Sequence, residues 1–157
     1  MKLILSLLLV ITTCSSCFSQ DKNQTKEINW ISLETALKLN KTSKPKPIFI
    51  DVYTDWCGWC KKLDATTFKD SAVVDYMTKN YLCVKLNAEQ KEDITFNDHI
   101  FHYVTQGNRG YNEIASVLLD GRLSYPSMVI LSPKNERTNL IIGYNDAPSL
   151  LQRLMAK

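Results

Sequence analysis

The sequence has little that is typical of a membrane protein, a nucleic-acid-binding protein or a disulfide-rich scaffold. After residue 20, no stretch approaches the run of about eighteen apolar residues that a membrane-spanning helix needs. A formal net charge of +3 at pH 7 is too small to indicate nucleic-acid binding. There is no internal repeat or low-complexity tract. The 157 residues, 45% hydrophobic and 22% charged, are instead what one globular domain with its own core requires.

The first nineteen residues are expected to be a targeting segment. Lys2 is followed by a short apolar run, residues 3–11, and then by small residues up to Ser19. This order is typical of a secretory signal peptide, so we expect cleavage after Ser19 and export to the periplasm or cell envelope. The alternative is a lipoprotein signal, in which Cys17 or Cys14 is acylated and anchors the mature chain. An uncleaved anchor would need a longer apolar run.

The remaining chain divides into a short lead-in and a single domain. Residues 20–29 are polar and are expected to be a flexible lead-in, and residues 30–157 are expected to fold. Three cysteines follow the targeting segment, too few for a disulfide scaffold. Cys83 lies in an apolar segment and is expected to be an inert buried thiol. The other two cysteines form a C-x-x-C motif, which would find disulfides to act on in an exported location.

Hydrophobic periodicity predicts alternating strands and helices. Each expected strand is a compact apolar run, and each helix has apolar positions at helical spacing. The expected order is a helix after Ser32, a strand at 48–53, a helix at 57–68, a helix capped by Asp70 or Ser71, a strand at 81–86, a helix at 111–119, strands at 127–131 and 138–142, and a last helix burying Leu150, Leu151, Leu154 and Met155. A parallel β–α–β start and an antiparallel hairpin end indicate a mixed sheet with helices on both faces.

The C-x-x-C motif, Cys57-Gly58-Trp59-Cys60, follows a predicted strand and begins a predicted helix. A thiolate is the nucleophile in disulfide exchange, and a helix N-terminus stabilises that anion. Cys60 lies one helical turn after Cys57, close enough to attack a mixed disulfide formed there. Gly58 permits a tight entry into the helix. Trp56 and Trp59 are expected to form apolar walls for an extended protein substrate, although Trp56 could equally be structural.

A C-x-x-C pair is also half of a tetrahedral zinc site. His99 and His102, the only two histidines, are spaced as H-x-x-H and could complete such a site. The position of the cysteines between a strand and a helix argues against this arrangement. We therefore expect both histidines to be surface residues, with no metal and no cofactor other than the redox-active disulfide.

The segment from Ile50 to Lys61 resembles the active-site segment of thioredoxins. Together with Thr67-Phe68 and residues 84–87, it is similar to exported thioredoxin-like proteins, above all to the periplasmic thioredoxin domain of membrane electron-transfer reductases. The resemblance covers residues 30–155. It implies an α/β thioredoxin fold with a mixed central sheet, helices on both faces and an insertion before the cis-proline loop.

The resemblance also implies further site residues. Asp51 occupies the position of a buried acid whose pKa is raised and which accepts the proton of Cys60. Lys85 occupies the position of a lysine near that acid, although it could equally face solvent. Pro126 occupies the position of a cis proline, which brings the backbone of Tyr125 beside the dithiol to pair with an extended client. A trans proline at the start of a strand is the alternative.

Two features depart from the thioredoxin pattern. The residues between the cysteines are Gly-Trp rather than Gly-Pro, which leaves the reduction potential open. Pro126 comes forty-one positions after Lys85, a longer connection than a minimal thioredoxin has. Residues 89–109 are accordingly expected to be an insertion, either an added helical lobe that shapes partner choice or a surface loop.

The leading hypothesis is a thioredoxin-like protein-disulfide oxidoreductase that acts as a reductant. Cys57 would attack, Cys60 would resolve, and a membrane electron-transfer reductase would recharge the pair. Partners would be proteins with disulfides or free thiols, the chain would be a monomer, and nucleic acid is not expected. Two alternatives use the same cysteines: a copper or zinc carrier, and a partner-binding module without catalysis.

Overall fold

The computed structural model describes residues 26–42 and 44–156, and within them one central sheet organises the chain. The expected signal segment 1–19, with Cys14 and Cys17, lies outside the described residues. The five strands of the sheet lie in the order β1 (Trp30–Ile31), β3 (Leu82–Asn87), β2 (Ile48–Tyr53), β8 (Ser127–Leu131) and β9 (Arg137–Ile142). Strands β1, β3 and β2 are parallel, whereas β8 is antiparallel to β2 and β9 to β8. The predicted mixed sheet is confirmed.

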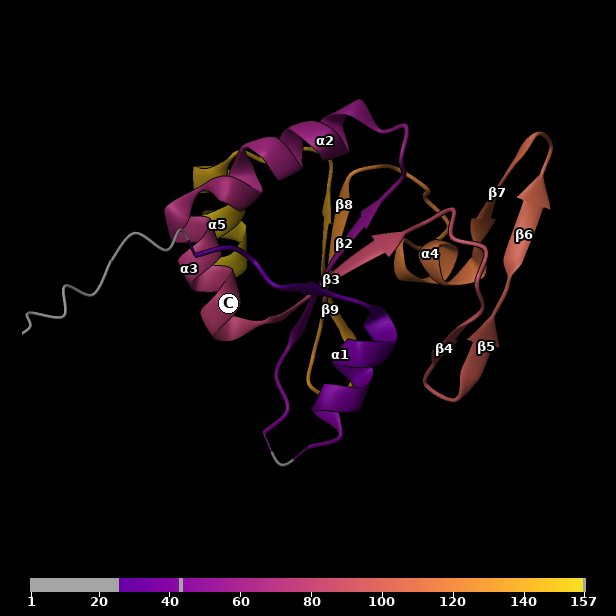
Figure 1. Cartoon of the computed structure of the whole chain (residues 1–157), viewed down its shortest axis with the longest axis horizontal. Helices are drawn as coiled ribbons and strands as arrows, with labels where there is room; N and C mark the ends of the chain where they lie inside the picture. The colour runs from indigo at the N-terminus through magenta and orange to yellow at the C-terminus, as the bar shows by residue number, and fades with distance from the viewer. Residues whose placement is uncertain (1–25, 43, 157) are drawn as a thin grey trace, which may run out of the picture.

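Helices cover both faces of this sheet. They are α1 (Leu33–Asn40), α2 (Gly58–Ala65), a short 3-10 helix η1 (Thr67–Lys69), α3 (Ser71–Asn80), α4 (Glu113–Leu118) and α5 (Ala147–Met155). In Figure 1 the sheet is seen nearly edge-on, with α2, α3 and α5 on one side and α1 and α4 on the other. This arrangement confirms the expected α/β class.

The alternation of side chains along the strands builds two apolar cores. Ile48, Ile50 and Val52 of β2 belong to the core beneath α1 and α4, whereas Phe49 belongs to the core beneath α2, α3 and α5. Successive side chains of a strand point to opposite faces, so Asp51 lies on the same face as Phe49. The only acidic residue of this strand is therefore directed towards the layer that contains α2.

Local sequence signals explain where most helices begin. The side chain of Ser32 accepts a hydrogen bond from the Thr35 amide at the start of α1, and Asp70 accepts from two amides at the start of α3. The helix expected at 57–68 is divided, because α2 ends at Ala65 and a 3-10 turn follows. Met155 was expected in the buried stripe of α5 but is exposed, because Leu150 and Leu154, four residues apart, share the buried face and Met155 lies beyond its edge.

The expected insertion consists of two β-hairpins rather than helices. Strands β4 (Ile94–Phe96) and β5 (His99–Phe101) form one hairpin, and β6 (Tyr103–Gln106) and β7 (Arg109–Asn112) form the other. Short strands with exposed faces have too few apolar residues to show a period of two. The expected helix at 111–119 begins only at Glu113, because Asn112 caps it and closes β7.

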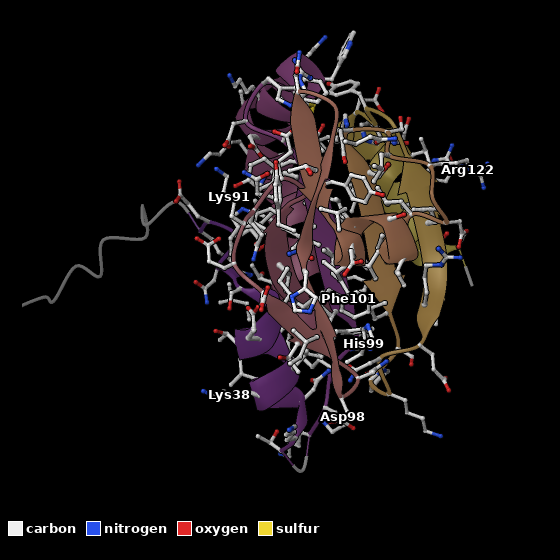
Figure 2. All side chains as sticks on the ribbon, turned by 90° about the vertical axis from the view of Figure 1, so that its right-hand side faces the viewer. Lys38, Lys91, Asp98, His99, Phe101 and Arg122 are labelled. Atoms are coloured by element: carbon white, nitrogen blue, oxygen red, sulfur yellow. A yellow bond between two sulfur atoms is a disulfide. The ribbon has the colours of Figure 1, made fainter. Side chains whose placement is uncertain are left out.

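The hairpins lie outside α4, on the side of the sheet away from α2 (Figure 1). Figure 2 looks onto them and shows His99 and Phe101 together on the β4–β5 hairpin, with Asp98 at its turn. The strand β1 was not expected, because two residues are too few to display an alternating pattern. No helix in the described part of the chain is long and apolar enough to cross a membrane.

Candidate active site: a disulfide at the N-terminus of helix α2

Cys57 and Cys60 form a disulfide where β2 leads into α2. The S–S distance is 2.06 Å and the two Cα atoms are 5.3 Å apart. Cys57 is the N-cap residue of α2, and its Sγ accepts a hydrogen bond from the Cys60 amide at 3.0 Å. Cys57 is 5% exposed and Cys60 2%. In the reduced protein, the unpaired amides of this first turn and the helix dipole would favour a thiolate at Cys57.

Two exposed tryptophans flank the disulfide. Trp56 is 52% exposed and Trp59 is 56% exposed, which is unusual for such large apolar side chains. Trp59 packs against Tyr144 with ring centroids 5.4 Å apart, and the ammonium of Lys62 lies 4.8 Å from the Trp59 ring centre. The dithiol is therefore bordered by aromatic surface on both sides.

Asp51 lies on the face of β2 that α2 covers, and it is almost fully buried. Its carboxylate is 1% exposed, and its Oδ2 accepts a hydrogen bond from Lys85 Nζ at 2.6 Å. Asp51 and Lys85 are register partners on the adjacent parallel strands β2 and β3. The ammonium of Lys85 also contacts Asp64 on α2. The lysine thus faces the acid rather than solvent alone, as the resemblance implied.

Burial controls the charge of the Asp51 carboxyl. Loss of hydration raises its pKa to about 6, although the charge and hydrogen bond of Lys85 act in the opposite direction. Its second oxygen, Oδ1, is buried and has no hydrogen-bond partner among the described residues. A carboxyl that titrates near neutral pH and keeps a free oxygen is able to exchange protons at working pH.

The cis-proline loop reaches the same end of the sheet. The Tyr125–Pro126 peptide bond is cis. Pro126 precedes β8, and since β8 is antiparallel to β2, its first residue lies where β2 ends: Ser127 is the register partner of Val52. The ring of Tyr125 contacts Trp56, with centroids 6.1 Å apart. The loop is therefore beside the segment that leads into the disulfide.

Comparison with known proteins agrees with this geometry. A family profile described as "Thioredox_DsbH: Protein of unknown function, DUF255" matches residues 10–141, which is most of the chain. The chain belongs to this family. The profile extends over the dithiol, the buried acid and the cis-proline loop described above.

Curated relatives of this Thioredox_DsbH chain match about half of it. A thiol:disulfide interchange protein DsbD of Vibrio vulnificus is 34% identical over 83 residues, which cover 48% of the chain and 14% of that protein. DsbD of Escherichia coli is 29% identical over 77 residues, covering 46% and 14%. The matched segment is thus a small fraction of those much longer relatives.

Solved structures show the same fold. A DsbH oxidoreductase has a TM-score of 0.60 at 16% identity, covering 87% of this chain and 89% of that one. A putative disulphide-isomerase from Bacteroides thetaiotaomicron has a TM-score of 0.59 at 27% identity, covering 83% and 93%. Together with the family match, these similarities show that the chain has a thioredoxin-like fold, and the Cys57–Cys60 disulfide lies in it at the N-terminus of α2.

Cys83 and the two histidines lie apart from this chemistry. Cys83 is a free, buried thiol whose pKa burial raises to about 12, so it remains protonated. His102 pairs through Nδ1 with Asp93 at 2.9 Å, and the His99 ring packs on Phe101. In residues 26–42 and 44–156, no cluster of three or more potential metal ligands is found.

Several residues near the site were not foreseen from the sequence. Asp64 contacts Lys85, and its position four residues after Cys60 on one helix face was the available signal. Glu89 and Arg109 both contact Trp56, the first by a hydrogen bond and the second over the ring. Nothing in the sequence pairs these two with residue 56, because they are distant along the chain.

Proposed function

We propose that this chain is a thiol–disulfide oxidoreductase that reduces protein disulfides in the cell envelope, with Cys57 as the attacking residue. The observation that supports this proposal is that Cys57 is the N-cap residue of α2 and that its Sγ accepts a hydrogen bond from an amide of the first turn. In the reduced form, the Cys57 thiolate attacks one sulfur of a client disulfide. The client S–S bond breaks, one client thiolate leaves, and a mixed disulfide joins Cys57 to the other sulfur.

The second step closes the Cys57–Cys60 disulfide. The Cys60 thiol loses its proton, attacks Cys57 Sγ and displaces the second client thiolate. Asp51 is the proposed proton acceptor, because its pKa lies near neutral and its Oδ1 has no partner among the described residues. Lys85 is a positioning residue that holds the other carboxylate oxygen. Two electrons have left the enzyme pair and entered the client.

The client chain is proposed to pair with the cis-proline loop while it reacts. Tyr125 and Pro126 offer backbone next to the disulfide, and Trp56, Gly58 and Trp59 form the adjoining surface. An extended client segment added along this backbone would place its cysteine at Cys57. No metal and no cofactor beyond the disulfide takes part in this scheme.

The charges behind the dithiol support a reducing role. A strongly oxidising pair needs a reduced form that is stabilised by nearby positive charge. The partly buried cation Lys85 lies behind the segment that carries the pair, and it is shared between the carboxylates of Asp51 and Asp64. Because Lys85 is already paired with two carboxylates, it adds little to the stability of the Cys57 thiolate, which depends mainly on the helix N-terminus. A reduced form with less stabilisation by charge corresponds to a lower reduction potential.

The reduction potential of the Cys57–Cys60 pair tests this direction. Equilibration with glutathione buffers, followed by thiol trapping and mass spectrometry, gives the oxidised fraction at each potential. We expect a reduction potential of about −270 mV, as for a reductant, whereas a potential of about −120 mV would make the protein an oxidant. An insulin-reduction assay should show turnover in the native chain and none with Cys57→Ser.

Location and electron donor are part of the proposal. We propose that residues 1–19 direct export, with release after Ser19 or lipid attachment at Cys17 or Cys14, and that a membrane electron-transfer reductase supplies the electrons. Mass spectrometry of the mature N-terminus from fractionated cells distinguishes these forms. A chain that retains residue 1 in the cytosolic fraction would contradict export.

A further inference from the structure

A pocket lies between the β6–β7 hairpin and the cis-proline loop, next to the disulfide. Its volume is about 180 Å³. The apolar part of its lining comes from four side chains: Trp56, Tyr111, Leu123 and Tyr125. These residues belong to the segment before α2, to β7 and to the loop before β8, so the pocket exists only because the hairpin is folded against the active-site end of the sheet.

Backbone contacts hold the hairpin in that place. The Asn112 amide, at the end of β7, donates to the Ala88 carbonyl at 2.7 Å, and Ala88 in turn donates to the Tyr53 carbonyl at 2.8 Å. Asn112 is fully buried and its side chain donates to the Glu92 carbonyl. The hairpin is thereby fixed to the end of β2 that leads into the disulfide.

Trp56 forms the wall of the pocket nearest the disulfide and is held from three directions. Its Nε1 donates to Glu89 Oε1 at 2.9 Å, and the Arg109 guanidinium lies 4.8 Å from its ring centre. The Tyr125 ring meets it edge-on. Contacts from three separate segments thus fix the orientation of the Trp56 ring, although the side chain is half exposed.

We infer that this pocket binds a large apolar side chain that neighbours the reacting cysteine of the client, and that Arg109 and Glu89 position Trp56 as its wall. The inference rests on the proposed function in one respect, that a client cysteine bonds to Cys57. Arg109 and Glu89 act through Trp56 and are positioning residues, whereas Trp56 and Tyr125 contact the client side chain.

The place of the pocket identifies its occupant as the client chain. Trp56 directly precedes Cys57, and Tyr125 directly precedes Pro126. A client that forms a disulfide with Cys57 must pass over this surface, and residues beside its cysteine come within reach of the pocket. No other segment in the described part of the chain fills it.

The lining favours an apolar occupant over a charged one. The two charged residues at the pocket, Glu89 and Arg109, have opposite signs, and both are already engaged with Trp56. A charged client side chain would lose hydration among aromatic rings and gain one attractive and one repulsive neighbour. An apolar side chain would gain by leaving water.

The experiment uses the Cys60→Ser variant, in which the first step occurs and the mixed disulfide accumulates. Short peptides of the form X-Cys, each linked by a disulfide to thionitrobenzoate, react with Cys57 and release the coloured thiolate. X is Phe, Leu, Ala, Asp or Lys. We expect Phe and Leu to exceed Ala by about tenfold in second-order rate, through tighter binding and not through a faster maximal rate.

Variants separate a positioning role from a merely structural one. Arg109→Ala should reduce the preference for Phe over Ala to about twofold or less, and Arg109→Lys should largely restore it because an ammonium also lies favourably over an indole ring. Arg122→Ala is the matched control, since the Arg122 side chain is exposed, as Figure 2 shows, and does not line the pocket. Reaction with hydroxyethyl disulfide, a small polar disulfide with no side chain to enter the pocket, measures the reactivity of Cys57 itself in each protein, and each peptide rate is divided by it.

A second variant tests the hairpin itself. A β-carbon at Gly110 would overlap the Tyr103 ring and the Val104 carbonyl oxygen, so Gly110→Ala should displace the hairpin and also abolish the preference. Circular dichroism checks that the domain remains folded.

Equal rates for Phe and Ala in the parent, or a preference for Asp or Lys, would overturn the pocket inference. So would an unchanged preference in Arg109→Ala. These results leave the proposed function intact, because the peptides still react. Failure of every peptide and of the small disulfide to react with Cys57 would instead contradict the proposed function.

Discussion

Lys85 donates a hydrogen bond to Oδ2 of Asp51 at 2.6 Å, and the same ammonium also contacts Asp64. One cation is therefore shared between a buried carboxylate and a half-exposed one. Burial opposes the charge of Lys85, but the two carboxylates outweigh it and raise the pKa of Lys85, so the ammonium stays charged. Asp51 remains the group that titrates near neutral pH, and four predictions follow from this site and from the cysteines.

Stability of the oxidised protein should fall as the pH rises through the titration of Asp51. The folded-state pKa of Asp51 is about 6, against an ordinary value of 3.8. Between these values the folded protein keeps a proton that the unfolded chain has lost, so the free energy of unfolding decreases with rising pH. Asp51→Asn should remove this slope and be more stable than the native chain at pH 8 by about 1–3 kcal/mol.

Urea unfolding at a series of pH values measures the effect. Asp98→Asn is the control, because Asp98 is an exposed carboxyl at the β4–β5 turn (Figure 2), where its positive φ also suits asparagine. An Asp51→Asn protein that keeps the native slope would show that another group binds the proton.

The same substitution should slow the closing of the enzyme disulfide. Without a carboxyl beneath the pair, Cys60 must lose its proton to water, and the second step should slow by about 10²-fold at pH 7. The first step, attack by Cys57, should change far less. Rapid-quench trapping of the mixed disulfide resolves the two rates, and equal slowing of both steps would argue against a proton-acceptor role for Asp51.

Replacing Lys85 by Met should move the pH dependence of that second step upwards. Desolvation of Asp51 remains in this variant while the attraction and hydrogen bond of Lys85 are lost, so the pKa of Asp51 rises above about 6. The rate of the second step as a function of pH gives the midpoint. Lys61→Met, at an exposed position of α2, serves as control. A midpoint that shifts downwards contradicts the assignment.

Cys83 should be unreactive in the folded protein. It is 4% exposed and its pKa is raised to about 12 by burial. Iodoacetamide at pH 8 should modify Cys57 of the reduced native chain at least about 10³-fold faster than Cys83, and both should react once urea unfolds the chain. Mass spectrometry of digested samples reports each site, and rapid native labelling of Cys83 would show that β3 opens.

The dithiol and its strand–helix setting were predictable because their signals are local. A compact β-branched and aromatic run precedes Cys57, and the two cysteines are one turn apart, so their chemistry follows from neighbours in sequence. The placement of Asp51 on the face of Phe49 also follows from the alternation of a strand. The pairing of Asp51 with Lys85 was inferred through resemblance, since the register of two strands cannot be obtained from either alone.

The two hairpins and the residues around Trp56 could not be predicted in this way. β4 to β7 have three or four residues each, which is too short for a recognisable period, and their turns depend on asparagine, aspartate and glycine at positive φ. Glu89 and Arg109 reach Trp56 across separate segments. Contacts of this kind form only when helices, strands and hairpins pack together, so no local pattern in the sequence predicts them.

By itself, the amino-acid sequence determined the dithiol, the helix that it caps and the strand that leads into it, because each arises from interactions within about one turn or one strand. Only the tertiary structure decided which groups surround that dithiol: Lys85 shared between two carboxylates, and a hairpin that closes a pocket beside Trp56. The physical reason is that hydrogen bonding and hydrophobic spacing act along the chain, whereas burial, charge pairing and pocket shape arise only when distant segments pack together.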